Sequence, residues 1–169
     1  METWDLYDRQ RRIIGEHRRG TELPPGGYHL VVHVWIRNSK GKYLMTQRSA
    51  EKATYPLAWE CVGGSALKGE SSIEAALRET SEEIGLHMSE NDAEHLFTFI
   101  RDVIDGKRIN DIVDVWLLRF DGDIPLEQAT TNEVEDAKWM DKEEIASLRD
   151  AGKLVSSIKD LGYFFEQMN

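Results

Sequence analysis

Apolar and polar residues alternate along several short segments of the chain, and this alternation is typical of half-buried β-strands. The clearest case is residues 29–37. One face of this strand would carry Leu30, Val32, Val34 and Ile36, and the other would carry His29, Val31, His33 and Trp35. The turn sequence at 38–42 leads into a second strand at 43–49, so the two segments are predicted to form a β-hairpin.

Other segments predict a further set of strands. Residues 4–20 are interpreted as two short strands around a polar turn, and a loop rich in proline and glycine follows at 24–27. A short strand is expected before the glycine pair at 63 and 64. The remaining strands are expected at residues 96–101, 111–120 and 137–140.

The central helix of the chain has a clear beginning and end. Ser71 and Glu74 have the spacing of a capping box, which marks the start of a helix. Gly85 suits the left-handed position that follows the last helical turn. The apolar face between these ends, which we expect to pack on a sheet, carries Ile73, Ala76, Leu77, Thr80 and Ile84.

Two more helices are predicted near the C-terminus. Asp141 and Glu144 form a second capping box, which opens one helix directly after the last strand. A final helix is expected at about 154–167, with an apolar stripe of Leu154, Ile158, Leu161, Phe164 and Phe165. Strands interspersed with helices predict a layered α/β or α+β domain.

The polar face of the central helix carries three glutamates, Glu79, Glu82 and Glu83. Like charges three or four residues apart destabilise a helix by roughly 0.2–0.5 kcal/mol per pair. Taken alone, such a cluster is usually a solvated surface. The preceding segment is rich in glycine, however, which lets backbone amides approach a ligand closely. The cluster is therefore also a candidate cation site.

Charge and composition narrow the classes of function. A net charge of −10 argues against binding to nucleic-acid polymers or anionic membranes, although a metal ion can still bring a phosphorylated ligand to an acidic site. The length of 169 residues fits one domain. Cys61 is the only cysteine, which excludes an intrachain disulfide and favours a reducing compartment. With no signal-peptide pattern and no long apolar run, we expect a cytoplasmic protein.

Residues 64–86 contain a fixed pattern of glycine and charged positions. Gly64, Glu70, Arg78, Glu79, Glu82, Glu83, Gly85 and Leu86 match G-x5-E-x7-R-E-U-x-E-E-x-G-U, where U is bulky and apolar. This pattern is the Nudix box, and the chain resembles a single Nudix domain over residues 1–169. One position departs, because Thr80 replaces an aliphatic residue. Its hydroxyl can bond back to a helical carbonyl and still let the side chain face the core.

The resemblance implies an α/β/α sandwich with a mixed sheet, and hydrolysis of a diphosphate linkage in a nucleoside diphosphate derivative. It implies Mg²⁺ or Mn²⁺ bound by Glu82 and Glu83, with Glu79 as a further ligand or as the general base. Arg78 would orient these glutamates, and Glu70 would support the site through the loop. Hard divalent cations do prefer carboxylate oxygens and water as ligands.

Further residues are candidates for the site. Arg48, Gly63 and Gly64 are expected to contact the diphosphate, and Glu133 is a candidate further carboxylate. Asp111 and Asp114 are an odd number of residues apart on one strand, so only one can face the helix, and we favour Asp111. Tyr55, Trp59 and Trp116 could stack on a base or lie in the core, and both alternatives remain open. His33 and Trp35 could line a pocket or form a dimer contact. The final helix is expected to cover the sheet or to join a homodimer interface.

A second reaction class is open. Residues 4–140 resemble the branch of the superfamily that includes isopentenyl-diphosphate isomerase, and His29 matches one of its metal-binding histidines. That enzyme needs a cysteine and a histidine where this chain has Gly63 and Ser65, and Cys61 lies two residues too early. Hydrolysis is therefore favoured. A non-catalytic ligand-binding module is a third hypothesis, which the complete box disfavours. No motif selects ADP-ribose, a dinucleotide polyphosphate, an oxidised nucleotide or a prenyl diphosphate.

Overall fold

The computed structural model describes all 169 residues. The strands are β1 (Thr3–Tyr7), β2 (Ile13–Arg18), β3 (His29–Arg37), β4 (Tyr43–Arg48), β5 (Trp59–Glu60), β6 (Val62–Ser65), β7 (Ala93–Ile104), β8 (Lys107–Arg119) and β9 (Val134–Met140). The helices are α1 (Ser72–Ile84), α2 (Lys142–Asp150) and α3 (Leu161–Gln167), with 3₁₀ turns at Glu90–Asp92, Leu126–Gln128 and Ser156–Ile158. None of these helices has the length and apolar character needed to cross a membrane.

Seven strands form one mixed sheet. Its main path runs β5-β4-β3-β8-β7, with β6 paired to β3 and β9 paired to β4. β3 and β8 are parallel from the pair His29–Asp111 to the pair Arg37–Arg119, and the other pairs are antiparallel. β1 and β2 form a separate two-stranded ribbon. The mixed sheet agrees with the predicted fold class.

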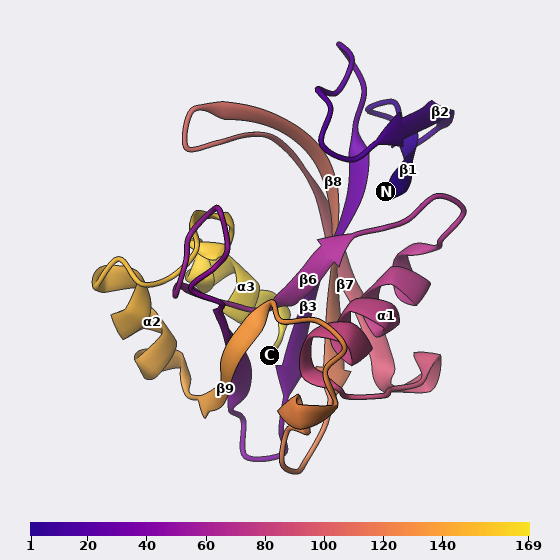
Figure 1. Cartoon of the computed structure of the whole chain (residues 1–169). Helices are drawn as coiled ribbons and strands as arrows, with labels where there is room; N and C mark the ends of the chain where they lie inside the picture. The colour runs from indigo at the N-terminus through magenta and orange to yellow at the C-terminus, as the bar shows by residue number, and fades with distance from the viewer.

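The sheet divides around β3. This strand pairs with β6 over Val31–Val34, but it pairs with β4 only at Arg37. β6 has no other strand partner, so its second edge is free. In Figure 1, β6 and β9 accordingly lie on diverging parts of the sheet.

Helices cover both faces of the sheet, as Figure 1 shows for α1 on one side and α2 and α3 on the other. The apolar residues of β3 divide as the alternation predicts. Val32 and Val34 are buried with Ala76 of α1, while Val31 and Trp35 are buried in a second cluster with residues of α2 and α3. Two apolar clusters separated by a sheet make an α/β/α sandwich.

The ends of α1 confirm the predicted caps. The Ser71 hydroxyl accepts from the Glu74 amide, the Glu74 carboxylate accepts from the Ser71 amide, and Gly85 has φ 71°. Thr80 is fully buried and its hydroxyl donates to the Ala76 carbonyl at 2.7 Å. The polar substitution in the box is therefore accommodated as expected.

The predicted final helix is wrong at its start. Residues 154–160 are not α-helical, and α3 begins only at Leu161. The cause is a long-range pairing, because the Trp59 amide donates to the Lys153 carbonyl at 2.8 Å and the Val155 amide donates to the Trp59 carbonyl at 3.0 Å. These bonds hold the chain extended at Leu154. Leu161, Phe164 and Phe165 of α3 do pack against the sheet, in the cluster that contains Trp35.

The strands β7 and β8 are longer than predicted and continue beyond the sheet as a curved hairpin, which arches away from the core in Figure 1. Asp105, at the tip of this hairpin, accepts hydrogen bonds from the hydroxyls of Tyr55 and Ser156. Lys159 lies 3.7 Å from the same carboxylate. The hairpin tip is thus joined to the loop after β4 and to the segment before α3.

Candidate functional site

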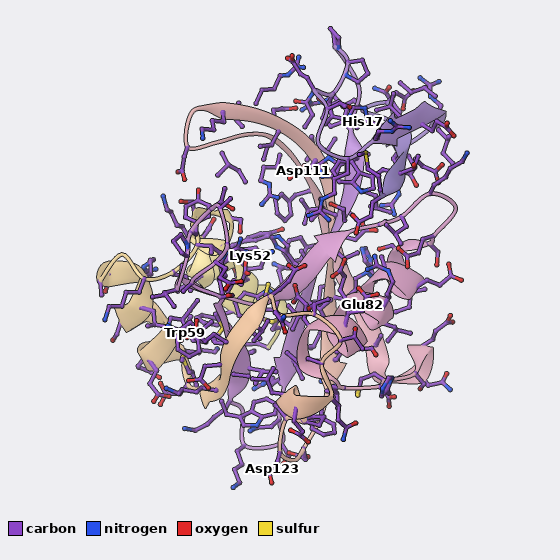
Figure 2. All side chains as sticks on the ribbon, viewed as in Figure 1. His17, Lys52, Trp59, Glu82, Asp111 and Asp123 are labelled. Atoms are coloured by element: carbon purple, nitrogen blue, oxygen red, sulfur yellow. The ribbon has the colours of Figure 1, made fainter.

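The glutamates of α1 line a polar cleft of about 500 Å³. α1 contributes one wall, β6 contributes Gly63 and Gly64, and the loop after β4 contributes another wall. Figure 2 labels one residue from each of two walls, Lys52 and Glu82. The charged residues that line the cleft are Glu2, Arg19, Arg48, Glu51, Lys52, Arg78, Glu79, Glu82, Glu83 and Glu133. The structure thus brings together the box glutamates, Arg48 and Glu133.

Arg78 lies at the centre of a carboxylate network. Its guanidinium donates to Glu70 at 2.8 Å, to Glu79 at 2.9 Å and to Glu82 at 3.0 Å, and also to the Ser65 carbonyl at 3.0 Å. Glu70 in turn accepts from the Leu67 amide at 2.8 Å. One arginine therefore links the helix to the loop before it and sets the positions of two glutamates.

Glu83 is buried, although the helical spacing places it on the polar face of α1. The pKa of its carboxyl is raised well above the usual value by burial, with further contributions from Glu60, Glu79 and Glu133. A hydrogen bond from the Gly63 amide opposes this shift. Burial likewise raises the pKa of Glu79 to about 7, against the opposing effect of Arg78. Several carboxylates thus lie close together in one small region and disfavour each other's ionisation.

Other atoms of the protein lie very close to the two glycines of β6. A Cβ on Gly64 would lie 2.2 Å from the Glu79 Oε1 atom, and a Cβ on Gly63 would lie 2.4 Å from the Val32 carbonyl oxygen. Gly63 has no room for a side chain, whereas a side chain at Gly64 would require the flexible end of Glu79 to move. Glu79 consequently reaches over the backbone of β6, which brings its carboxylate close to the Gly64 main chain.

The donor set of the cleft fits a hard divalent cation. All three glutamates offer oxygen ligands, and a bound cation would stabilise the charged form of Glu79 and Glu83, whose pKa values are raised by burial and by neighbouring carboxylates. In the present arrangement no three acidic, histidine or cysteine side chains converge as a metal site, and Arg78 holds Glu79 and Glu82. A metal would therefore compete with Arg78 for these two carboxylates.

The structure adds two residues to the cleft region that the sequence did not single out, Glu60 and Lys52. Glu60 forms an ion pair with Arg48 at 2.6 Å, and burial raises the pKa of its carboxyl although Arg48 opposes the shift. Lys52 pairs with Glu133. The position of Glu60 between the apolar Trp59 and the glycine pair is the feature of the sequence that could have identified it.

Asp111 and Asp114 do face opposite sides of the sheet, but neither lines the cleft, so our preference for Asp111 is not supported. Asp111 lies 3.0 Å from the Arg101 Nε atom and 3.2 Å from the His29 Nδ1 atom. Asp114 accepts from Arg11 at 2.6 Å. The reason is the strand order, because β3 lies between β8 and β6. Figure 2 accordingly shows Asp111 well away from Glu82.

The aromatic candidates lie outside the cleft. Trp59 and Trp35 are buried in the apolar cluster under α2 and α3. Trp116 is half-buried and donates its indole N–H to the Ser72 hydroxyl at 2.9 Å. Tyr55 is on the surface with its hydroxyl on Asp105, and none of these rings is free to stack on a base in the cleft.

Comparison with known proteins identifies the family. The model of the NUDIX domain matches residues 27–161. The chain belongs to the Nudix hydrolase family. Members of this family hydrolyse pyrophosphate bonds, so the predicted enzyme class is confirmed.

Individual proteins support this assignment. An uncharacterised Nudix hydrolase of Listeria monocytogenes is 36% identical over 168 residues, which cover 98% of this chain and 91% of that protein. An isopentenyl-diphosphate Delta-isomerase of Klebsiella pneumoniae is 28% identical over 121 residues, covering 70% and 64%. The crystal structure of DR0079 from Deinococcus radiodurans has the same fold, with a TM-score of 0.71 at 24% identity over 92% and 93% of the two chains. The resemblance to an isomerase-like branch is consistent with these matches.

Proposed function

We propose that this Nudix hydrolase cleaves a diphosphate linkage in a nucleoside diphosphate derivative or a similar compound, and that it uses Mg²⁺ or Mn²⁺. The observation that supports this most is the group of crowded carboxylates beside Gly63 and Gly64, facing the cations Arg48 and Lys52 across one cleft. Carboxylates suit the metal, and the two cations suit phosphate oxygens.

Glu82 and Glu83 would hold the metal ion. When bound, the ion supplies charge neutralisation at the diphosphate and lowers the pKa of an attacking water. Glu79 acts as a further ligand or as the general base, because its carboxylate lines the cleft beside Glu82 and Glu83. Arg78 keeps Glu79 and Glu82 at the cleft through its hydrogen bonds to both.

Arg48 and Lys52 would bind the diphosphate. Arg48 forms an ion pair with Glu60, and Lys52 forms one with Glu133. Both cations are therefore paired with carboxylates of the protein. A diphosphate offers more acceptor oxygens than one carboxylate and would exchange with these partners. The displaced carboxylates then add to the negative charge that favours metal binding.

The isomerase alternative is weakened by the composition of the site. Gly63 and Ser65 occupy the positions where the isomerase has a cysteine and a histidine, and a side chain on Gly63 would collide with the Val32 carbonyl. Cys61 is buried in the apolar cluster under α2 and α3. A binding module without catalysis is disfavoured because the box is complete.

The test is a screen for cleavage of the diphosphate linkage, with the products identified by chromatography, over ADP-ribose, a dinucleotide polyphosphate, an oxidised nucleotide and a prenyl diphosphate, with Mg²⁺ and with Mn²⁺. The variant Glu83→Gln removes one ligand charge and keeps the shape. We expect it to lose activity at least about 100-fold, which corresponds to roughly 2.7 kcal/mol of transition-state stabilisation.

Glu143→Gln is the matched control, because Glu143 is exposed in the first turn of α2. It should hydrolyse the same compounds as the unmodified protein. Equal activity of Glu83→Gln and the unmodified protein would contradict the proposed metal site. Isomerisation of isopentenyl diphosphate without hydrolysis would favour the isomerase instead, and binding without any turnover would favour the non-catalytic binding module.

A further inference from the structure

A second cavity, of about 170 Å³, adjoins the cleft. It lies on the side of the sheet that carries Val31 and His33, opposite to α1. Gly63 and Gly64 line both the cavity and the cleft. These glycines have no side chains and the second edge of β6 has no strand partner, so the cleft and the cavity share the main chain of β6 as part of their lining.

Two buried nitrogen atoms at this cavity have no hydrogen-bond partner in the protein. They are Nη1 of Arg101 and Nδ1 of His33. The His33 side chain is only 7% exposed, and both residues line the cavity. A buried polar group without a partner costs about 1–3 kcal/mol, so these atoms indicate that something polar completes the site.

The charge of Arg101 is already balanced. Asp111 accepts from its Nε and Nη2 atoms, which leaves Nη1 as the remaining donor. Glu60 also lines the cavity, which makes an anionic occupant unfavourable. Burial lowers the pKa of His33 to about 3, so its ring is neutral at ordinary pH and adds no positive charge.

A hydrocarbon occupant is unfavourable too, because it would leave Arg101 Nη1 and His33 Nδ1 without partners. The rest of the lining is mixed, with apolar Val31 and Ile158 beside the hydroxyl of Ser157. In size the cavity is close to the roughly 150 Å³ cavities that hold one benzene ring. A single neutral ring that carries hydrogen-bond acceptors therefore fits both the size and the chemistry.

We propose that this cavity binds a neutral polar ring of the substrate, a sugar or a heterocycle joined to the diphosphate, and that Arg101 and His33 determine specificity by hydrogen bonding to it. The inference rests on the proposed function, since it takes the diphosphate to lie in the cleft beside the glutamates. The ring then passes the free edge of β6 and enters from the side of Gly63 and Gly64.

The test uses four compounds that form a complete set. ADP-ribose carries both rings, the P²-methyl ester of ADP carries the heterocycle without the second sugar, the methyl ester of ribose 5-diphosphate carries the sugar alone, and dimethyl diphosphate carries neither. The variant Ser157→Leu narrows the cavity without touching the carboxylates, and His33→Phe keeps the ring shape while removing the nitrogen atoms. Ser147→Leu, at an exposed position of α2, is the matched control.

Turnover is the first measurement. Ser157→Leu and His33→Phe should lower kcat/KM at least about 10-fold for the compounds that carry the recognised ring, corresponding to roughly 1.4 kcal/mol. Dimethyl diphosphate should be hydrolysed equally by both variants and by the unmodified protein. The ADP ester and the ribose ester distinguish binding of the nucleoside from binding of the second sugar, according to which of them responds. An equal effect on all four compounds, or none on any, would overturn the proposal while leaving the hydrolase function intact.

The second measurement does not depend on turnover. Binding of the four compounds can be measured by isothermal titration calorimetry. In Glu83→Gln, the compounds that carry the recognised ring should bind more tightly than dimethyl diphosphate does, and the difference should disappear when Ser157→Leu is added. If all four compounds bind with equal affinity, the proposed subsite is wrong even where the chain proves inactive as a hydrolase.

Discussion

The buried histidine of β3 makes the stability of the fold depend on pH in a way that can be calculated. His33 packs against Phe99 and Phe164, and Arg101 lies nearby. Burial, followed by the charge of Arg101, lowers its pKa from 6.5 to about 3. The folded state therefore keeps His33 neutral, whereas the unfolded chain takes up a proton as the pH falls below 6.5.

The sign follows from this difference in proton binding. The contribution of His33 to stability is complete above pH 6.5 and is lost as the pH falls toward 3. Between pH 8 and pH 5 the loss amounts to about 2 kcal/mol, a substantial part of the roughly 5–15 kcal/mol of a typical domain. In His33→Phe this part of the pH dependence should disappear, whatever the substitution does to stability at pH 8.

The assay is urea unfolding at constant ionic strength without divalent metal, at pH 5, 6, 7 and 8. The difference in the free energy of unfolding between pH 8 and pH 5 should be smaller by about 2 kcal/mol in His33→Phe. His87→Phe makes the same substitution at an exposed position and should keep the original difference. If His33→Phe retains the full dependence, His33 is not held neutral by its surroundings and the reasoning fails.

Two glycine substitutions test the geometry around α1. Gly64→Ala places a methyl group against the flexible end of Glu79, so we expect weaker Mn²⁺ binding by calorimetry, with a change in the urea midpoint that is small by comparison. Normal Mn²⁺ affinity would show that the close contact between Glu79 and Gly64 is not needed for metal binding. Gly85→Ala forces a side chain into φ 71° with its Cβ 2.4 Å from the Pro125 carbonyl oxygen, and should lower the free energy of unfolding by about 1–3 kcal/mol. An unchanged urea midpoint would show that a side chain at position 85 causes no strain.

Elements with local signals were predicted well. Ser71, Glu74 and Gly85 define both ends of α1 by contacts within a few residues, and a sequence pattern can record such contacts. The start of the last helix depends instead on hydrogen bonds between Trp59 and the segment around Lys153. Nothing in the apolar stripe of residues 154–167 records that distant partner, so the helix was predicted too long.

The same distinction explains the site. Glu79, Glu82 and Glu83 lie on one helix, and their spacing alone places them together. Glu60 reaches the cleft region only because β5 pairs with β4, and Asp111 is separated from it because β3 lies between β8 and β6. Strand order is a property of the whole fold, which the alternation of single strands does not reveal.

The parallel pairing of β3 with β8 also determines when the cleft forms during folding. His29 pairs with Asp111 and Arg37 with Arg119, so the pairing closes a long loop that contains β4, β6 and all of α1. Contacts of such high contact order are slow to form, because the entropy of loop closure is lost before they are gained. Glu133 lines the cleft and follows β8 in the chain, so we expect the glutamates of the cleft to reach their final positions only after this closure. A divalent ion that binds them stabilises a structure already assembled, and it therefore slows unfolding without accelerating folding.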